Sequence, residues 1–332
     1  MISRTDNQLV DPYGRRIEYV RLSVTDRCNY RCFYCLPKGF KDFEEPAHWL
    51  TFAEIERVMS AFAELGVARI RLTGGEPLVR KNLPQLVKGL ASLPGVDDLS
   101  LSTNASLLAR DAHDLKDAGI SRINVSLDTL NADRFRDITG GGELVAVLDG
   151  LRTARDAELN PIKINMVAMK GVNDDEFDDM LEFCMENEFT LRFIETMPMG
   201  APGQSARDSY LELDGVLETL HDKYELIPSC MPGGGPARYY QVAGSDTRIG
   251  LITPISRHFC ETCNRVRMTV DGTLYLCLGQ EHSYPLRPLL RSGISNEGLK
   301  DAIIEALALK PERHEFREKP DQVIRCMSLT GG

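Results

Sequence analysis

The stretch "EYVRLSVTDRCNYRCFYC" (residues 18–35) joins the pattern of a β-strand to three closely spaced cysteines. Residues 18–24 alternate polar and apolar side chains, as strands do, and Cys28, Cys32 and Cys35 follow in a C-x-x-x-C-x-x-C array. Three thiolates this close can hold three corners of an iron–sulfur cubane, which leaves the fourth iron without a protein ligand. The alternatives are a zinc site completed by a remote histidine, or buried cysteines that bind nothing. The position at the carboxyl end of a strand, where barrel active sites lie, favours the cluster.

The strand pattern of residues 18–24 recurs five more times, with helical patterns between the copies. The other predicted strands are residues 69–75, 98–103, 122–128, 162–169 and 190–196. The predicted helices are residues 51–66, 82–93, 111–119, 143–159 and 175–188. Regular β-α alternation predicts a parallel sheet with right-handed crossovers. Because six units are too few to close an eight-unit barrel, we predict an α/β fold with an open, partial (βα)6 TIM-like barrel. A flat, doubly wound sheet is the alternative.

The β-α pattern breaks at about Met197. Residues 197–209 and 228–240 are rich in glycine, proline and serine and are interpreted as loops. Residues 248–253, 265–270 and 272–278 predict a small antiparallel sheet, and residues 296–310 predict a helix. We therefore expect two units, residues 1–244 and residues 245–332, of which the second is a smaller α+β unit.

The composition of the 332-residue chain narrows the class of protein. The first residues lack the apolar core of a secretory signal, and no window is apolar enough for a spanning helix, so a cytoplasmic protein without a membrane partner is expected. The formal charge of −10 argues against a general nucleic-acid surface, which needs a basic stripe. A cluster of a few arginines could still bind a small anion.

Two further stretches bear on chemistry. "LTGGEP" (residues 72–77) follows the second strand, and its paired glycines let a ligand lie close to the backbone, although a plain β-α turn explains them as well. "FCETCNRVRMTVDGTLYLCL" (residues 259–278) contains a second trio, Cys260, Cys263 and Cys277. Its spacing also fits a zinc ribbon with His258 or His282 as the fourth ligand.

Together, these motifs resemble those of known enzymes. The first cysteine array, with Tyr34 before its last cysteine and a following G-G-E-P, resembles the radical S-adenosylmethionine (radical SAM) enzymes. That resemblance implies a six-unit partial barrel and a [4Fe–4S] cluster whose open iron binds S-adenosylmethionine and cleaves it to a 5′-deoxyadenosyl radical. The C-x-x-C-N-R-x-R pattern and the terminal Gly-Gly are similar to those of the GTP 3′,8-cyclases, the MoaA family of molybdenum-cofactor biosynthesis. The likeness runs almost from end to end of the chain.

Four basic residues give an independent reason to expect an anionic ligand. Arg21, Arg71, Lys163 and Arg192 all lie within predicted strands, and strand parity puts Arg21 and Arg71 on polar faces. Pairing with buried carboxylates such as Glu76 or Asp128, or a place at an exposed sheet edge, would explain any one of them. For four together, a bound polyanion such as a triphosphate is the simpler explanation, because an unpaired buried cation is costly.

The family resemblance implies a role for particular residues. Two [4Fe–4S] clusters would be held, the first by Cys28, Cys32 and Cys35 and the second by Cys260, Cys263 and Cys277. S-adenosylmethionine would lie against Tyr34, Gly75, Ser126 and Met197. GTP would be bound by Arg21, Arg71, Ser102, Lys163, Arg192, Arg265 and Arg267. Arg265 and Arg267, together with Gly331 and Gly332 of the tail, would act in catalysis.

The implied reaction converts GTP to (8S)-3′,8-cyclo-7,8-dihydroguanosine 5′-triphosphate, the first step of molybdenum-cofactor biosynthesis. The implied partners are an electron donor, the downstream cyclic pyranopterin monophosphate synthase and a second copy of the chain in a homodimer. One alternative is a radical SAM enzyme whose auxiliary cluster serves peptide modification. Another is an iron–sulfur or zinc-ribbon binding module without turnover.

Overall fold

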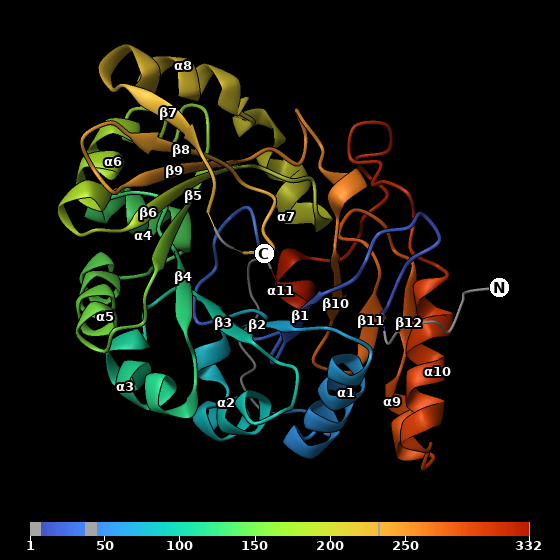
Figure 1. Cartoon of the computed structure of the whole chain (residues 1–332). Coiled ribbons are helices and arrows are strands. Elements are labelled where there is room, and N and C mark those ends of the chain that lie inside the picture. Colours follow the sequence, from blue (N-terminus) through green and yellow to red (C-terminus); the bar gives the residue numbers. More distant parts are fainter. Residues whose placement is uncertain (1–7, 37–44, 232, 332) are drawn as a thin grey trace.

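A single curved sheet of twelve strands organises the molecule, as the computed structural model of residues 8–36, 45–231 and 233–331 describes it (Figure 1). The strand order is β12-β11-β10-β1-β2-β3-β4-β5-β6-β9-β8-β7. Its central six strands, all parallel, are β1 (Tyr19–Ser23), β2 (Arg69–Thr73), β3 (Asp98–Thr103), β4 (Arg122–Ser126), β5 (Ile162–Ala168) and β6 (Thr190–Glu195). These are the six predicted strands, in sequential order. A doubly wound sheet reverses its strand order at a switch point, so the alternative fold was wrong and the partial barrel is confirmed.

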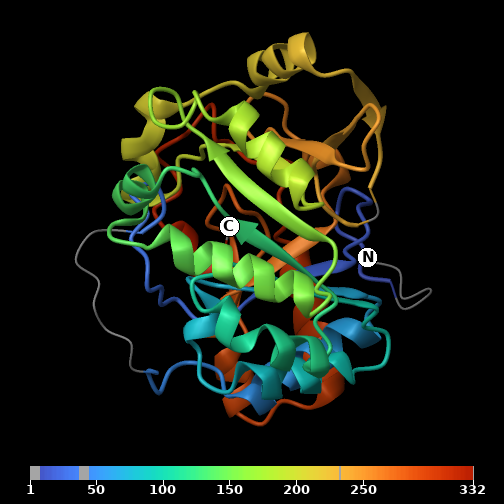
Figure 2. The same ribbon diagram turned by 90° about the vertical axis from the view of Figure 1, so that its left-hand side faces the viewer.

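Helices cover the outer side of these strands in Figures 1 and 2. They are α1 (Phe52–Glu64), α2 (Leu83–Ala91), α3 (Leu108–Ala118), α4 (Ala132–Thr139), α5 (Leu144–Asp156) and α6 (Phe177–Glu186), with the short 3-10 turn η1 (Pro77–Val79) before α2. Local chemistry fixes their ends. Thr51 and Glu54 form a capping box at the start of α1, and Gly119 ends α3 with a φ of 116°. The sequence did not reveal α4, which is only two turns long.

Both edges of the six-stranded core recruit a strand from the C-terminal part of the chain. β10 (Arg265–Met268) pairs in parallel with β1, and β9 (Arg248–Ile252) pairs in parallel with β6. The prediction that these two strands share one small antiparallel sheet was therefore wrong. An open barrel leaves unpaired backbone groups along its first and last strands, and each edge is satisfied by a different strand. Only β11 (Thr273–Tyr275) and β12 (Ser283–Pro285) continue antiparallel from β10.

Two segments interpreted as loops contain regular structure. Residues 197–209 form α7 (Gly200–Ser205) and the 3-10 turn η2 (Ala206–Ser209), and residues 228–240 include parts of β7 (Leu226–Ser229) and β8 (Arg238–Val242). β7 and β8 pair with each other, and β8 pairs with β9, all antiparallel. Helix α8 (Leu213–Lys223) leads into this extension. The glycine and proline residues made these segments resemble loops. The strands form nevertheless, because backbone pairing rather than residue propensity stabilises them.

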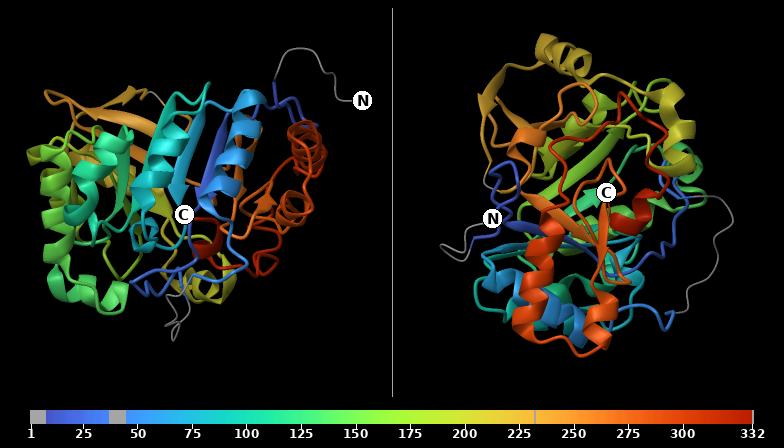
Figure 3. Two further views of the ribbon diagram at one scale, coloured as in Figure 1. Left: turned by 90° about the horizontal axis from the view of Figure 1, so that it is seen from below. Right: turned by 90° about the vertical axis from the view of Figure 1, so that its right-hand side faces the viewer.

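The remaining elements lie beside β10–β12 or inside the curve of the sheet. They are η3 (Cys260–Thr262), α9 (Arg287–Arg291), α10 (Asn296–Leu307) and α11 (Met327–Thr330). Figure 3 shows α10 next to α1 on the outer side, whereas α11 lies in the middle of the curve in Figure 1. No helix among the described residues is long and apolar enough to cross a membrane.

Candidate active site

The first cysteine trio lines a cavity at the carboxyl ends of the parallel strands. Tyr34, Gly75, Ser126 and Met197, the four residues expected to contact S-adenosylmethionine, line the same cavity as Cys28, Cys32 and Cys35. Ser102, which was expected to contact GTP, also lies here. The loop is short and turned, with the Cys35 backbone N–H donating to the Cys32 carbonyl oxygen at 2.9 Å. Burial raises the pKa of all three thiols, to about 11 for Cys28 and about 12 for Cys35. An electropositive group is therefore needed to hold them as thiolates.

The paired glycines of residues 72–77 bring this turn against the cysteine loop. A Cβ on Gly75 would lie 2.0 Å from the Arg27 carbonyl oxygen, and one on Gly74 would lie 2.2 Å from that of Thr25. Gly74 also has a φ of 142°. The next residue, Glu76, is 1% exposed and accepts hydrogen bonds from Leu78 N, Thr103 Oγ1 and Asn104 N at 3.0, 2.7 and 2.6 Å. Burial raises its pKa to about 7. The two glycines thus allow the turn to lie close to the cysteine loop. Glu76 holds the turn against β3 through the hydrogen bond from Thr103.

A second buried carboxylate orients Tyr34. The Tyr34 hydroxyl donates to Asp128 Oδ2 at 2.5 Å, while Asp128 Oδ1 accepts from Val167 N at 2.8 Å. Burial raises the pKa of Asp128 to about 6. Neither Asp128 nor Glu76 pairs with the four basic residues of the strands, so the carboxylate pairing considered from the sequence was wrong for both residues.

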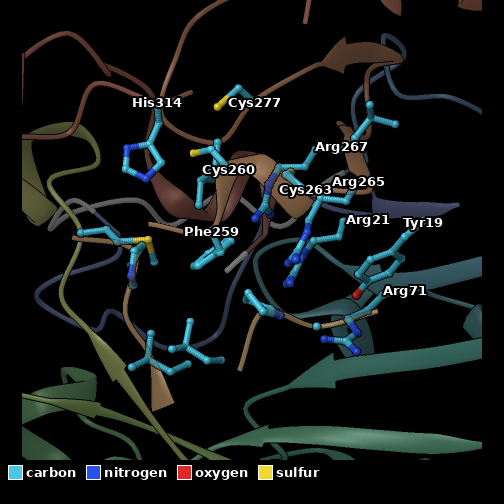
Figure 4. A pocket seen from close by; sticks show the side chains of 18 of the residues that line it. Tyr19, Arg21, Arg71, Phe259, Cys260, Cys263, Arg265, Arg267, Cys277 and His314 are labelled. Carbon is cyan, nitrogen blue, oxygen red and sulfur yellow. The ribbon is translucent and has the colours of Figure 1, made fainter. Parts of the chain in front are cut away.

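The second cysteine trio lines another cavity, on which the arginines converge (Figure 4). It is lined by Cys260, Cys263, Cys277, Arg21, Arg71, Arg192, Arg265 and Arg267, among others. Strand register explains the convergence, because Arg21 of β1 stands between Arg267 of β10 and Arg71 of β2. This cavity shares Asn165, Ile194 and Met197 with the first. The two trios therefore face neighbouring parts of one barrel interior.

A third cavity of about 370 Å³ continues from the second and is strongly basic. It shares Arg71 and Arg192 with the second cavity and adds Arg122, Lys163 and Tyr239. Lys163 is 5% exposed, and burial, together with the charges of Arg192, Arg122 and Arg71, lowers its pKa to about 7. The charge of Asp98 opposes this shift but is outweighed, so Lys163 lies in a net positive environment that an anionic ligand would neutralise.

The buried arginines are similarly short of acceptors. Arg21 is 7% exposed, and its Nε and Nη2 nitrogens have no hydrogen-bond partner among the described residues. Burial, followed by the charge of Arg267, holds the pKa of Arg21 well below its ordinary value. Arg192 donates to two neutral amides, Asn165 Oδ1 at 2.8 Å and Asn124 Oδ1 at 2.5 Å, and it also interacts with the Tyr239 side chain. In the part of the chain that the structure describes, no carboxylate neutralises either of them.

Three basic residues that the sequence analysis missed hold the second trio in place. Lys310 Nζ donates to the carbonyl oxygens of Leu276 and Arg265 at 2.6 and 3.0 Å and lies 3.7 Å from Cys263 Sγ. Arg15 Nη1 donates to the Cys260 carbonyl oxygen at 2.8 Å, and Arg325 Nη2 donates to that of Cys277 at 2.9 Å. Burial opposes ionisation of Cys263, but the Lys310 and Arg265 charges prevail and lower its pKa. No local motif marks these residues, because each acts from a distant segment.

The C-terminal tail enters between the two trios. Met327 of α11 lines the first cavity, and Arg267 Nη1 donates to the Gly331 carbonyl oxygen at 2.5 Å. Gly332 lies outside the described residues. The tail thus connects the arginine cluster to the first cysteine site.

Two family models match the chain. The Radical SAM superfamily model matches residues 22–184, and the Molybdenum Cofactor Synthesis C model matches residues 189–316. Among full-length relatives, the GTP 3′,8-cyclase of Hydrogenovibrio crunogenus is 45% identical over 98% of this chain and 99% of its own. The GTP 3′,8-cyclase of Marinobacter nauticus is 46% identical over the same shares. The chain belongs to the GTP 3′,8-cyclase family. In Pseudomonas aeruginosa, the family member named GTP 3′,8-cyclase 2 is 46% identical over 99% of this chain.

Solved structures show the same fold at much lower identity. Streptococcus suis SuiB bound to S-adenosylmethionine has a TM-score of 0.61, with 12% identity over 90% of this chain and 73% of its own. SuiB bound to its precursor peptide has a TM-score of 0.60. At this identity the likeness concerns the fold alone.

Family membership gives the chain a [4Fe–4S] cluster with S-adenosylmethionine and a second, C-terminal cluster. The donor sets fit both groups, because each site offers three free thiols beside a cavity. Among the described residues, no three His, Cys, Asp or Glu side chains gather tightly enough for a single metal ion. The irons of a cubane stand at separate corners, so its thiolates spread more widely than the ligands of one ion. Cys184, by contrast, is fully buried in the core.

Proposed function

We propose that this chain is a GTP 3′,8-cyclase that converts GTP to (8S)-3′,8-cyclo-7,8-dihydroguanosine 5′-triphosphate, the first step of molybdenum-cofactor biosynthesis. One observation carries the proposal: two three-cysteine sites open onto one interior lined by buried cations, and among the described residues no carboxylate pairs with Arg21 or Arg192. GTP suits that interior, since its triphosphate is a polyanion and the second cysteine trio lines the same cavity as the arginines. The sequence identity of 45% to a GTP 3′,8-cyclase over 98% of this chain supports the same conclusion.

We assign the first site to S-adenosylmethionine and its cluster. Cys28, Cys32 and Cys35 would hold the cluster, and Tyr34, Gly75, Ser126 and Met197 would line the S-adenosylmethionine. When bound, the cluster with S-adenosylmethionine would supply radical chemistry that abstracts hydrogen from the substrate ribose. The chain contributes position: Gly74 and Gly75 let the turn lie close against the backbone of Thr25 and Arg27, and Asp128 fixes Tyr34 by a 2.5 Å hydrogen bond.

We assign the second site and the basic cavity to GTP. Cys260, Cys263 and Cys277 would hold the second cluster near the guanine. The triphosphate would be bound by Arg21, Arg71, Lys163, Arg192, Arg265 and Arg267, and Ser102, which lines the first cavity, would contact GTP from there. By binding the phosphates, fixed cations in a buried cavity would hold the ribose carbon C3′ in place. This matters because a small displacement of a reacting atom lowers the reaction rate sharply. Arg265, Arg267 and the tail glycines Gly331 and Gly332 would act at this centre.

These assignments divide the chain into two functional regions. Residues 1–244 would form the radical SAM barrel, and residues 245–332 would form the auxiliary-cluster and substrate-binding region, since the second trio, Arg265, Arg267 and the tail all lie there.

We further propose a cytoplasmic homodimer that receives electrons from a donor protein and passes its product to cyclic pyranopterin monophosphate synthase. A peptide-modifying radical enzyme, the alternative, shares the fold but leaves the basic cavity without a purpose.

Anaerobic reconstitution tests the proposal. The full chain should bind about eight iron atoms, consume GTP and release 5′-deoxyadenosine once a reductant is added. A variant with Cys260, Cys263 and Cys277 changed to alanine should keep about four irons and cleave S-adenosylmethionine without cyclising GTP. Four irons in the unmodified chain, or S-adenosylmethionine cleavage with GTP untouched, would overturn the assignment.

A further inference from the structure

Tyr19 stands at the centre of the arginine cluster, although no sequence motif singles it out. It is the first residue of β1 and is 3% exposed. Strand register places it beside Arg265 of β10, one step along β1 from Arg21 on the same face. Figure 4 shows its ring near Arg21 and Arg71, with the hydroxyl oxygen directed toward the space where the arginine side chains converge. Tyr19 is thus part of the cavity wall.

The ring and the hydroxyl of Tyr19 have different surroundings. The guanidinium carbons of Arg71 and Arg265 lie 5.4 and 5.8 Å from the ring centroid, so the ring already separates and stabilises two cations. The hydroxyl is buried and has no hydrogen-bond partner among the described residues. A phenylalanine would make the same cation–π contacts without burying an unpaired polar group, which is costly. The hydroxyl therefore needs a separate explanation.

The chemistry of the neighbourhood defines the missing partner. Four arginines, namely Arg71, Arg21, Arg265 and Arg267, act electrostatically on the phenol, and guanidinium groups offer no acceptor. Burial alone would raise the pKa of Tyr19, but these four charges lower it overall, which strengthens the hydroxyl as a donor. A neutral donor also adds a contact to an anion without adding another positive charge to a crowded cluster.

We propose that Tyr19 is a further substrate-binding residue, whose hydroxyl donates a hydrogen bond to a phosphate oxygen of GTP. The inference rests on the proposed function and deepens it, because it adds a neutral donor to the predicted arginine and lysine contacts. The ring of Tyr19 keeps Arg71 and Arg265 apart, and its hydroxyl fixes the phosphate between them.

The test is a Tyr19→Phe variant of the full chain, reconstituted anaerobically, with nucleotide binding measured by equilibrium dialysis. A hydrogen bond to a charged group predicts a Kd for GTP that rises about tenfold or more. Guanosine, which has no phosphate, should bind both proteins equally. A Tyr284→Phe variant is the control, because that hydroxyl contacts Glu305 at 3.3 Å on the surface. It should leave both dissociation constants unchanged.

Different outcomes separate this inference from the proposed function. If the unmodified chain binds GTP and Tyr19→Phe binds it equally well, the role of Tyr19 is refuted while the function stands. If Tyr19→Phe weakens the binding of guanosine as much as that of GTP, the hydroxyl contacts the nucleoside or supports the fold. The phosphate contact is then refuted. If the unmodified chain does not bind GTP, both proposals fail. Iron content and thermal unfolding midpoint, measured for each variant, would show any general damage to the protein.

Discussion

Arg267 Nη1 donates hydrogen bonds to the carbonyl oxygens of Gly331, at 2.5 Å, and of Thr330, at 3.1 Å. Gly331 has a φ of 71°, and a Cβ at this position would lie 2.3 Å from both Oγ1 and Cγ2 of Thr73. Thr73 directly precedes the glycine pair of the first site, whereas Arg267 follows the second cysteine pair. A single glycine therefore joins the two halves of the candidate site, and no other residue fits there.

The first prediction concerns this glycine. Gly331→Ala should lower the rate of GTP cyclisation about a hundredfold, because the added methyl group displaces the tail and with it Arg267. Both clusters and S-adenosylmethionine cleavage should persist, as iron content and 5′-deoxyadenosine release would show. Gly215→Ala, where nothing lies within 4 Å of the new Cβ, is the matched control. Normal cyclisation by Gly331→Ala would mean that the tail tolerates displacement.

The second prediction is a pH dependence of GTP binding that originates at Lys163. The pKa of Lys163 is about 7 in the free protein, and a neighbouring phosphate would raise it. Above pH 7, Lys163 must therefore take up a proton when GTP binds. Affinity for GTP should therefore fall as the pH rises from 7 to 9, by up to tenfold per unit. Lys163→Arg keeps its charge over this range and should show a flatter profile. Parallel profiles for the two proteins would exclude Lys163 as the source.

The third prediction tests how the extension β7–β8–β9 reaches the basic cavity. The Tyr239 ring lies over Gly250, with Lys163 Nζ 5.6 Å from the ring centroid. A Cβ on Gly250 would be 2.8 Å from Tyr239 Cε1 and 3.0 Å from Arg192 Cγ. Gly250→Ala should therefore displace both side chains and raise the Kd for GTP about tenfold.

Binding of S-adenosylmethionine provides the control for Gly250→Ala, because the first cavity does not include Gly250. It should be unchanged when measured on the same reconstituted sample. If GTP binding were also unchanged, Tyr239 and Arg192 would have no part in holding the phosphates.

The fourth prediction concerns Lys310, which is 3% exposed and holds the carbonyl oxygens of Arg265 and Leu276, two residues between Cys263 and Cys277. Lys310→Met should leave those oxygens unpaired and cost about 1–3 kcal/mol per buried group. Iron content after reconstitution should fall from about eight toward about four atoms per chain. Lys300→Met, which breaks only ion pairs with Glu64 and Glu297 near the surface, should keep the full content. Full iron in Lys310→Met would show that the trio needs no such support.

Much of the barrel could be predicted because its signals are local. Strand alternation and helical periodicity predicted all six parallel strands and the helices between them except α4, and strand parity put Arg21 and Arg71 on polar faces, which line the second cavity. The pairing of β9 and β10 could not be predicted in this way. Each strand is recognisable by itself, but its partner is whichever sheet edge offers unpaired backbone groups, and that depends on the whole fold.

The sequence by itself determined the two cysteine trios, the glycine turn and the family, since cluster ligands and tight turns require particular residue types at fixed spacing. Only the tertiary structure brought Tyr19 and Lys310 to these sites, and it supplied the contact with Arg267 for Gly331, whose role the family resemblance had implied. Each lies far along the chain from the groups it contacts, and no spacing rule links residues that meet across strands or through the tail. Burial completes the site, because the curved sheet removes Arg21 from water while its Nε and Nη2 nitrogens gain no hydrogen-bond partner among the described residues.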